Sequence, residues 1–286
     1  MSYDLLLEGS DLDPFRLLMK TEANVESGDD GKSWLFQDES TGVYFTMRVD
    51  AVIDDELIAA GASTAPYISC EINFLRPSFF MDEALPAILR YARETGLTVR
   101  DPQREDVPLT PDVVDQTAIR TQWLAVTAKW ARESSEALPF LDPTSSAAMF
   151  QHNLTRDALM NDPVRNKAGL FIPLLLPIIR SAEPRRVRTG IVIGPNIALL
   201  IPPCDVVVLA SRKSVLGVDV GPFLKRLVTR AAFNEHLAEY LEFPTNPASA
   251  LLAPNISRAW SALKGLPAEP ESSFDKLDFD RFVDVE

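Results

Sequence analysis

The amino-acid sequence predicts an α+β protein with mainly antiparallel sheets, packed helices and two domains. In several segments apolar residues alternate with polar ones, as in strands with one buried face. In others they recur every three or four positions, as in amphipathic helices. Turn-forming residues separate consecutive strand-like segments, which favours antiparallel hairpins. The chain has 286 residues, 46 % of them hydrophobic. Because domains most often contain about 100–150 residues, this length favours two domains.

The first domain is expected at residues 1–104 and begins with strands. Residues 3–8 form the first predicted strand, followed by a loop rich in Glu, Ser, Gly and Asp. Two further strand-like stretches, 34–36 and 43–49, flank the sequence Asp-Glu-Ser-Thr-Gly at 38–42. Asp, Ser and Gly favour a turn there, so we expect a hairpin.

The clearest strand covers residues 67–74, where Ile, Cys, Ile and Phe alternate with Tyr, Ser, Glu and Asn. This period of two predicts one buried sheet face and one polar face. A helix is then expected to begin at Asp82 and to end at Gly96, because an acidic residue suits a helix N-terminus and glycine a C-terminus. Residues 97–99 return as a strand, which completes a βαβ-like unit.

The second domain is expected at residues 105–286. After a polar connection at 102–111, residues 112–134 predict a long helix. Trp123 and Trp130 are seven positions apart, which brings them to one buried face of this helix. The other predicted elements, in chain order, are a helix at 147–161, an antiparallel meander of strands at 171–179, 187–193, 197–201 and 205–210, a helix at 221–240, a short helix carrying Trp260, and an acidic tail.

Residue types that carry catalysis or bind metals are scarce. The chain has two histidines and two cysteines, and their spacing matches none of the common zinc motifs. The nucleotide-binding and serine-hydrolase motifs are also missing. The sequence therefore predicts no cofactor, no metal and no enzymatic activity. A basic cluster of three arginines (Arg185, Arg186 and Arg188) is typical of a solvated hairpin tip.

Acidic residues are concentrated at the two ends of the chain. Residues 1–60 contain 14 acidic and four basic residues, and residues 269–286 contain seven and two. Such a field repels nucleic acid and anionic lipid and attracts a basic protein. A surface tuned for solubility is the alternative interpretation. The predicted partner-binding residues are acidic positions in these two ends, namely Asp54, Asp55, Glu56, Asp275, Asp278, Asp280 and Asp284.

The sequence also predicts a cytoplasmic location. The longest apolar run, residues 168–179, contains two prolines and is shorter than the roughly 20 residues that span a bilayer. The first residues are acidic and lack the basic start of a secretory signal. Cys70 and Cys204 lie in apolar surroundings, which is typical of small buried side chains in a reducing compartment.

Two blocks of sequence resemble a widespread group of bacterial proteins. The first runs from Tyr67 to Pro86 and continues at Asp101-Pro-Gln, and the second contains Phe150-Gln-His-Asn, Leu170-Phe-Ile-Pro and Ile201-Pro-Pro-Cys-Asp-Val-Val-Val. Members of this group look like immunity proteins found beside polymorphic toxins, including those of type VI secretion, and one set is paired with nuclease effectors. The resemblance implies a cytoplasmic protein that binds and blocks a cognate toxin, which would have a basic surface.

Two other functions stay open from the sequence. An enzyme of unrecognised type would use Glu71, Asn73 or Arg76 in a cleft between the domains, and an adaptor or chaperone would bind a secretion substrate. Arg76 is instead expected to hold the turn after the strand onto the following helix. A neighbouring toxin gene favours the immunity protein, a metabolic operon the enzyme, and secretion genes the adaptor.

Overall fold

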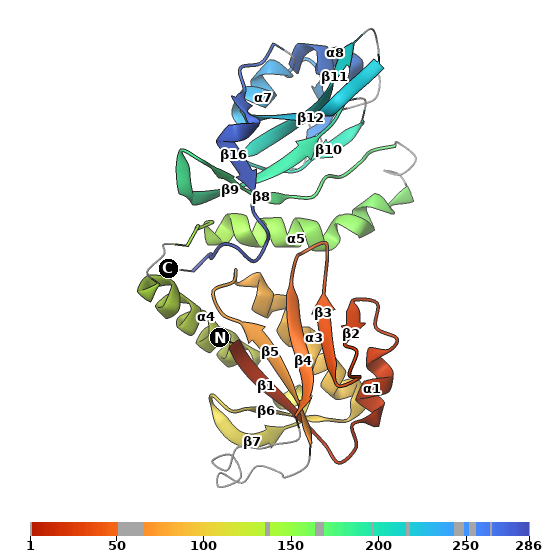
Figure 1. The fold of residues 1–286 in the computed structure, drawn as a ribbon, viewed down its shortest axis with the longest axis vertical. Helices are drawn as coiled ribbons and strands as arrows, with labels where there is room; N and C mark the ends of the chain where they lie inside the picture. The colour runs from red at the N-terminus through yellow and green to blue at the C-terminus, as the bar shows by residue number, and fades with distance from the viewer. Residues whose placement is uncertain are drawn as a thin grey trace. The chain divides into compact units, whose positions relative to one another are not determined.

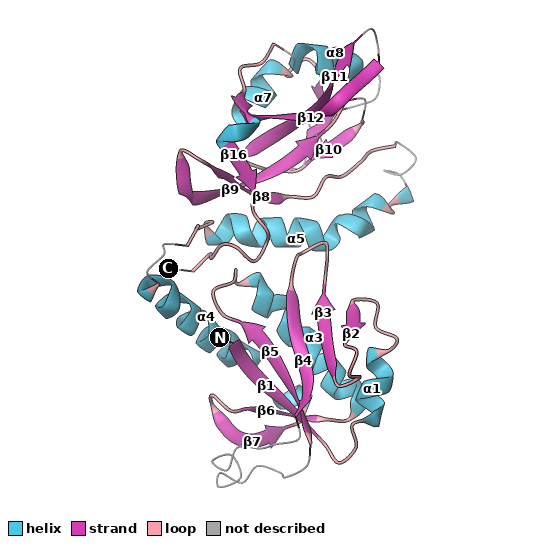
Figure 2. Cartoon of the chain, in the orientation of Figure 1, coloured by secondary structure: helices cyan, strands magenta, loops and turns pink. Residues whose placement is uncertain are grey.

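The computed structural model describes residues 2–50, 66–134, 138–163, 169–195, 197–215, 218–242, 249–251, 256–263 and 265–285. Helices and antiparallel strands are mixed through these residues, so the predicted α+β fold is confirmed (Figure 2). The chain divides into two compact units, residues 1–137 together with 283–286, and residues 138–282 (Figure 1).

The first unit is a seven-stranded antiparallel sheet with helices on one face. The strands are ordered β2-β3-β4-β5-β1-β6-β7. The elements, in chain order, are β1 (Ser2–Glu8), α1 (Asp13–Met19), β2 (Val25–Ser27), β3 (Ser33–Gln37), β4 (Tyr44–Asp50), β5 (Tyr67–Asn73), α3 (Phe79–Thr95), β6 (Thr98–Asp101), β7 (Glu105–Leu109) and α4 (Gln116–Glu133).

Several predicted elements of this unit are confirmed. The alternation in β5 buries Ile68, Cys70 and Ile72 completely, and the hairpin β3–β4 turns at residues 38–42. Helix α3 ends as predicted at Gly96, whose φ of 71° is left-handed and therefore favours glycine. The helix begins at Phe79, earlier than the predicted start at Asp82. Strands β5 and β6 are both antiparallel to β1, which lies between them.

Helix α4 belongs to the first unit, which moves the domain boundary from the predicted residue 104 to residue 137. Trp123 stacks on Phe74 with ring centroids 6.3 Å apart, and Arg120 forms an ion pair with Asp82 of α3. These contacts fix α4 against the first sheet's helical layer. Trp123 is fully buried as predicted, whereas Trp130 is only half-buried.

Three short elements of the first unit were not expected from the sequence. Strand β7 lies within the polar connection predicted at 102–111 and pairs with β6. Strand β2 lies within the loop predicted at 22–32, and helix α1 lies in the stretch before it, for which no element was predicted. Phe15 of α1 packs edge-on against Trp34 and Tyr91, which ties α1 to the sheet and to α3. Tertiary contacts of this kind stabilise helices and strands too short to be recognised from periodicity.

The second unit contains helix α5, a curled six-stranded sheet and a small three-stranded sheet. The strand orders are β15-β12-β11-β9-β8-β16 and β10-β14-β13. The elements, in chain order, are α5 (Pro143–Met160), β8 (Leu176–Arg180), β9 (Glu183–Ile193), β10 (Leu199–Ile201), β11 (Val206–Val215), β12 (Val218–Thr229), α7 (Arg230–His236), β13 (Leu241–Glu242), β14 (Ser249–Leu251), α8 (Ile256–Leu263), β15 (Glu269–Pro270) and β16 (Phe274–Lys276).

The six-stranded sheet curls because its two edge strands are consecutive in the chain. β15 pairs with β12 at one edge and β16 pairs with β8 at the other, and only the 3₁₀ turn Glu271–Ser273 separates them. The guanidinium of Arg180 in β8 binds both carboxylate oxygens of Glu269 in β15. Residues 269–276, expected to be part of an acidic tail, are therefore part of this sheet.

The concave side of the curled sheet holds a small apolar core. Phe274 from β16 packs in a cluster with Ile178, Val206, Val208 and Leu227. Gly190 of β9 lies beneath this cluster, where a Cβ atom would be 2.7 Å from Ile178 Cγ1 and 2.9 Å from Val206 Cγ2. The core thus needs a residue without a side chain at this position.

Two predictions for the second unit are wrong in part. The first half of the helix predicted at 221–240 is strand β12, which pairs with β11, and only α7 is helical. Leu227 and Val228 are adjacent and both buried, since both faces of this strand are covered, and such a strand lacks the alternation that identifies strands. The predicted antiparallel meander is interrupted, because β9 and β11 are parallel and β10 joins the other sheet.

Candidate functional site

The helix-free face of the first sheet carries polar side chains at most positions. Helix α3 packs on the opposite face, behind β4 and β5 in Figure 1. On that side Trp34, Met47 and Cys70 are buried. Because side chains alternate along a strand, the residues between them point to the helix-free face.

The strand register places five residues in one row across this face. Glu26 of β2 pairs with Leu35 of β3, and Leu35 pairs with Thr46 of β4. Thr46 pairs with Glu71 of β5, and Glu71 with Asp4 of β1. Neighbouring strands are about 4.8 Å apart, so the backbones at Glu26 and Glu71 are roughly 14 Å apart. We call these five residues the cross-strand row.

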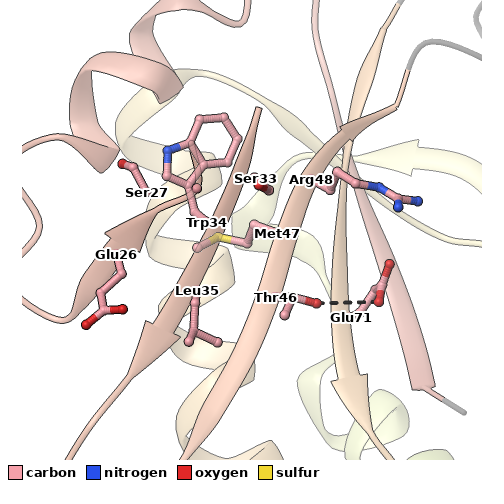
Figure 3. A pocket seen from close by; sticks show the side chains of 10 residues that line it. Glu26, Ser27, Ser33, Trp34, Leu35, Thr46, Met47, Arg48 and Glu71 are labelled. Carbon is pink, nitrogen blue, oxygen red and sulfur yellow. Dashed lines mark hydrogen bonds between the residues drawn. The ribbon is translucent and has the colours of Figure 1, made fainter. Parts of the chain in front are cut away.

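A pocket of about 450 Å³ opens on this face between Glu26 and Glu71 (Figure 3). Leu35 and Thr46 lie between the two carboxylates, and the Thr46 hydroxyl donates to Glu71 Oε2 at 3.4 Å. We call it the β2–β5 pocket. Its lining residues are Glu26, Ser27, Gly28, Ser33, Trp34, Leu35, Thr46, Met47, Arg48 and Glu71.

The charge of Arg48, beside the pocket, is balanced by Asp50 on the same strand. Arg48 Nε lies 3.0 Å from Asp50 Oδ1, and the hydrogen bond to Asp50 raises the pKa of the Arg48 guanidinium. Ser69 Oγ donates to the other oxygen, Asp50 Oδ2, at 2.8 Å. Burial, and then the Asp50 charge, raise the pKa of the neighbouring Tyr67. Arg48 is therefore already engaged within the sheet.

The second arginine of this face is also paired, and it is buried. Arg100 Nε lies 2.7 Å from Glu8 Oε1, and the two side chains are 3 % and 12 % exposed. The face is thus buried where Arg100 and Glu8 lie. We call the remainder, from β2 to Asp4 of β1, its open half, because Glu26 is exposed and Glu71 and Asp4 are half-buried. Within the described part of the chain, no Lys or Arg forms an ion pair with Glu26, Glu71 or Asp4. These three carboxylates give the face a net negative charge.

The motif Phe150-Gln-His-Asn lies on α5 and binds the backbone of the segment before β8. Asn153 donates to the carbonyl of Leu175 and accepts from its N–H, both at 2.9 Å. His152 Nε2 donates to the carbonyl of Pro173 (2.9 Å) and Arg156 Nε to that of Ile172 (2.8 Å). Burial lowers the pKa of His152, with a smaller contribution from Arg156. These side chains of α5 hold the chain that enters β8, which is a structural role.

The block at residues 201–208 is also fixed by hydrogen bonds to its backbone and side chains. Arg230 Nη1 donates to the carbonyl of Pro202 at 2.6 Å and lies 3.4 Å from Cys204 Sγ. Asp205 accepts from the Thr189 N–H at 2.8 Å. Burial raises the pKa of the Cys204 thiol, which disfavours the reactive thiolate.

The predicted partner-binding residues have different surroundings. Asp54, Asp55 and Glu56 lie outside the described residues. Asp275 and Asp278 are exposed and Asp280 is half-buried. Asp284 is 1 % exposed. Its carboxylate accepts from the N–H and the hydroxyl of Ser78, at 2.7 and 2.8 Å. Asp284 is thus inside the first unit, where a partner has no access to it, so this prediction needs correction.

The three residues named in the alternative enzyme hypothesis have different roles in the structure. Glu71 lines the β2–β5 pocket, and Asn73 ends β5. Arg76 Nη2 donates to the Tyr44 hydroxyl at 2.9 Å and Nη1 to the Leu75 carbonyl at 3.2 Å. These bonds tie the turn after β5 to β4, and Tyr44 in turn packs edge-on against Phe80 of α3.

Sequence reasoning missed Glu26, Asp4 and Arg48 as members of a common face. The alternation in residues 44–50 does predict that Arg48 points away from the core. Which strands are neighbours, however, depends on pairing between distant segments. Within the described residues no group of three or more His, Cys, Asp or Glu side chains is placed to hold a metal ion.

The described residues contain no helix long and apolar enough to cross a membrane. Comparison with protein-family models, with curated proteins and with solved structures gives no significant match for this chain. The candidate site is therefore defined by its own geometry and charge.

Proposed function

We propose that this chain is an immunity protein that binds a cognate secreted toxin in the cytoplasm and neutralises it. The toxin would present a basic surface to the open half of the helix-free face. The observation that carries this proposal is the cross-strand row, where Glu26, Glu71 and Asp4 share one face while the arginines of that face are paired with other acids. A face with a net negative charge attracts a cationic partner and orients its approach.

The toxin class follows from the resemblance to immunity proteins paired with nuclease effectors. A nuclease binds its substrate through phosphates, so its groove carries Lys and Arg. An acidic face that enters such a groove pairs with the Lys and Arg side chains that would otherwise bind the substrate phosphates, and so blocks the substrate.

For the binding test, this chain is immobilised and used to capture its partner from the native cell. The partner is identified by mass spectrometry and then purified. We expect its association rate to fall markedly from 50 to 500 mM salt, because the screening length falls from roughly 14 to 4 Å. Dissociation should change much less. A salt-independent association rate, or a captured partner without basic surface residues, contradicts the proposal.

Two double variants locate the charges that matter. Glu26→Gln with Glu71→Gln removes two negative charges from the open face, and Asp275→Asn with Asp278→Asn removes two from the second unit. We expect the first pair to slow association by about five- to tenfold and the second by less than twofold. Equal slowing by both pairs would mean that net charge, and not this face, attracts the partner.

Neutralisation is tested in cells. Expression of the captured partner alone should stop growth, and co-expression of this chain should restore it. A captured partner that is harmless when expressed, or whose toxicity this chain does not relieve, excludes the immunity function even if binding is tight.

A further inference from the structure

Strand β2 is an edge of the first sheet, and no strand among the described residues pairs with its outward backbone groups. The Gln37 N–H donates to the Asn24 carbonyl and the Gly28 N–H to the Ser33 carbonyl, both at 2.8 Å. In an antiparallel ladder every second residue bonds to the same neighbour, so residues 24, 26 and 28 face β3. Val25 and Ser27 therefore direct their N–H and C=O groups away from the sheet.

One of these outward N–H groups forms a hydrogen bond within the described part of the chain. The Val25 N–H lies 3.4 Å from the Glu22 carbonyl. In the described part of the chain, no hydrogen bond involves the Ser27 N–H or the carbonyls of Val25 and Ser27. These three groups form the pattern that an added strand would complete.

The side chains beside this edge determine which strand fits. Glu26 is exposed and lies at the end of the cross-strand row, next to the β2–β5 pocket (Figure 3). A residue of an added strand opposite Glu26 would extend the row by one position. Side chains directly opposite one another interact strongly, so Lys or Arg is favoured there and an acidic residue is disfavoured.

The same charge disfavours pairing with a second copy of this chain. Two β2 strands paired antiparallel about Glu26 would bring two carboxylates face to face, and each copy carries a net charge of −13. Short, charged edges resist self-association for this reason. The edge is therefore selective for an oppositely charged strand.

We propose that the partner binds by adding an extended segment with alternating Lys or Arg residues to β2, with the basic side chains over Glu26 and the β2–β5 pocket. This inference rests on the proposed function and names its binding mode. The outward N–H and C=O groups supply affinity that does not depend on sequence, and Glu26 supplies the preference for a basic strand.

The direct test uses the full chain and the synthetic peptide acetyl-Lys-Val-Lys-Val-Lys-Val-Lys-amide as the probe. Ser27→Pro removes the outward N–H without removing a bond to β3, and an edge strand tolerates proline at such a position. The matched control, Ser27→Ala, removes the side chain and keeps the N–H. We expect Ser27→Pro to raise the peptide Kd at least tenfold, Ser27→Ala to change it less than twofold, and both variants to melt near the wild-type temperature.

A second variant keeps the test decisive if Ser27→Pro unfolds. Glu26→Lys should reverse the charge preference, so that this variant binds the corresponding Glu-Val peptide better than the Lys-Val peptide. Hydrogen exchange of the Ser27 amide should slow in the wild-type complex. No binding of the Lys-Val peptide, equal binding of both peptides to the wild-type chain, or an unprotected Ser27 amide overturns strand addition.

The two proposals fail separately. If the captured toxin binds the Ser27→Pro variant as tightly as the wild-type chain but loses affinity for the Glu26→Gln/Glu71→Gln variant, the acidic face is the interface and strand addition is wrong. If the Lys-Val peptide binds as expected while no toxin is neutralised, the edge site exists and the immunity function is wrong.

Discussion

Glu83 is a carboxyl group on α3 whose neutral form is favoured by the fold. Burial raises its pKa to about 7, a hydrogen bond to Thr41 opposes this, and the nearby Asp38 adds to the rise. Glu83 Oε2 is buried without a hydrogen-bond partner in the described structure. The hairpin turn at 38–42 is therefore attached to α3 through a carboxyl group that prefers to be neutral.

The stability of the first unit should consequently fall as pH rises from about 5 to 8. The pKa of Glu83 is higher in the folded chain than in the unfolded one, so the folded state binds more protons in this window and stability is lost as pH rises through 7. In urea unfolding, the decrease of the unfolding free energy between pH 5 and 8 should be smaller by about 1–2 kcal/mol in Glu83→Gln than in the wild-type chain. This difference is less than the pKa shift alone would give, because the side chain is part-exposed. The control variant is Glu39→Gln, because Glu39 is an exposed glutamate in the same hairpin turn. An unchanged pH slope in Glu83→Gln would contradict this assignment.

Asp284 contributes stability because it caps α3 from the far end of the chain. Its carboxylate accepts two hydrogen bonds from Ser78 at the helix N-terminus, where negative charge is also favoured by the helix dipole. Asp284→Ala should lower the free energy of unfolding of the first unit by about 1–3 kcal/mol. Asp278→Ala, at an exposed site, should change it by less than about 0.5 kcal/mol. A Trp260→Phe background restricts the fluorescence to tryptophans of the first unit. Equal effects of the two variants would contradict the capping role.

At the scale of the element, the curled sheet has β9 between β8 and β11, and side chains of these two strands approach closely at Gly190. Gly190→Ala would place a Cβ atom within 3 Å of two core side chains, and we expect it to cost about 1–3 kcal/mol of stability in the second unit. Gly194→Ala is the matched control, because its nearest neighbour would be Ile197 Cδ1 at 3.7 Å, an ordinary contact. Urea unfolding measured with Trp260 as the reporter compares them. Equal stability of the two variants would show that the core adapts to the added methyl group.

At the scale of the whole molecule, the last residues of the chain complete both units. Residues 269–276 supply both edges of the curled sheet, and residues 283–286 belong to the first unit. The C-terminal end is thus structural, and its acidity is partly committed to the contact with Ser78.

Two deletions should therefore have different effects. Removal of residues 283–286 should lower the melting temperature of the first unit by several degrees and leave the second unit within about 1 °C, because the cap on α3 and the buried side chain of Val283 both belong to the first unit. Removal of residues 269–286 should destabilise both units, since the curled sheet loses Phe274 and its edges. Separate tryptophan reporters in each unit, Trp123 and Trp260, measure this. A second unit that melts normally without residues 269–276 would contradict their role in closing the sheet.

The sequence alone determined the features that depend on neighbouring residues. The alternation at 67–74 identified β5 and its buried face, the turn residues at 38–42 identified the hairpin, and Gly96 marked the end of α3. Each is decided by the conformational preference of a few consecutive residues, and this preference does not depend on contacts with distant segments.

The tertiary structure decided what depends on pairing between distant segments. β12 is a strand because β11 lies beside it, and its adjacent buried residues Leu227 and Val228 break the alternation that would identify a strand. Asp284 is a cap and not a surface charge because Ser78, 206 residues away in sequence, donates two hydrogen bonds to its carboxylate at the start of α3. The cross-strand row exists only through the register of five strands, and a shift of one residue would turn its carboxylates to the other face. The sequence therefore carried the acidity of the chain, and the strand register placed Glu26, Glu71 and Asp4 on one face.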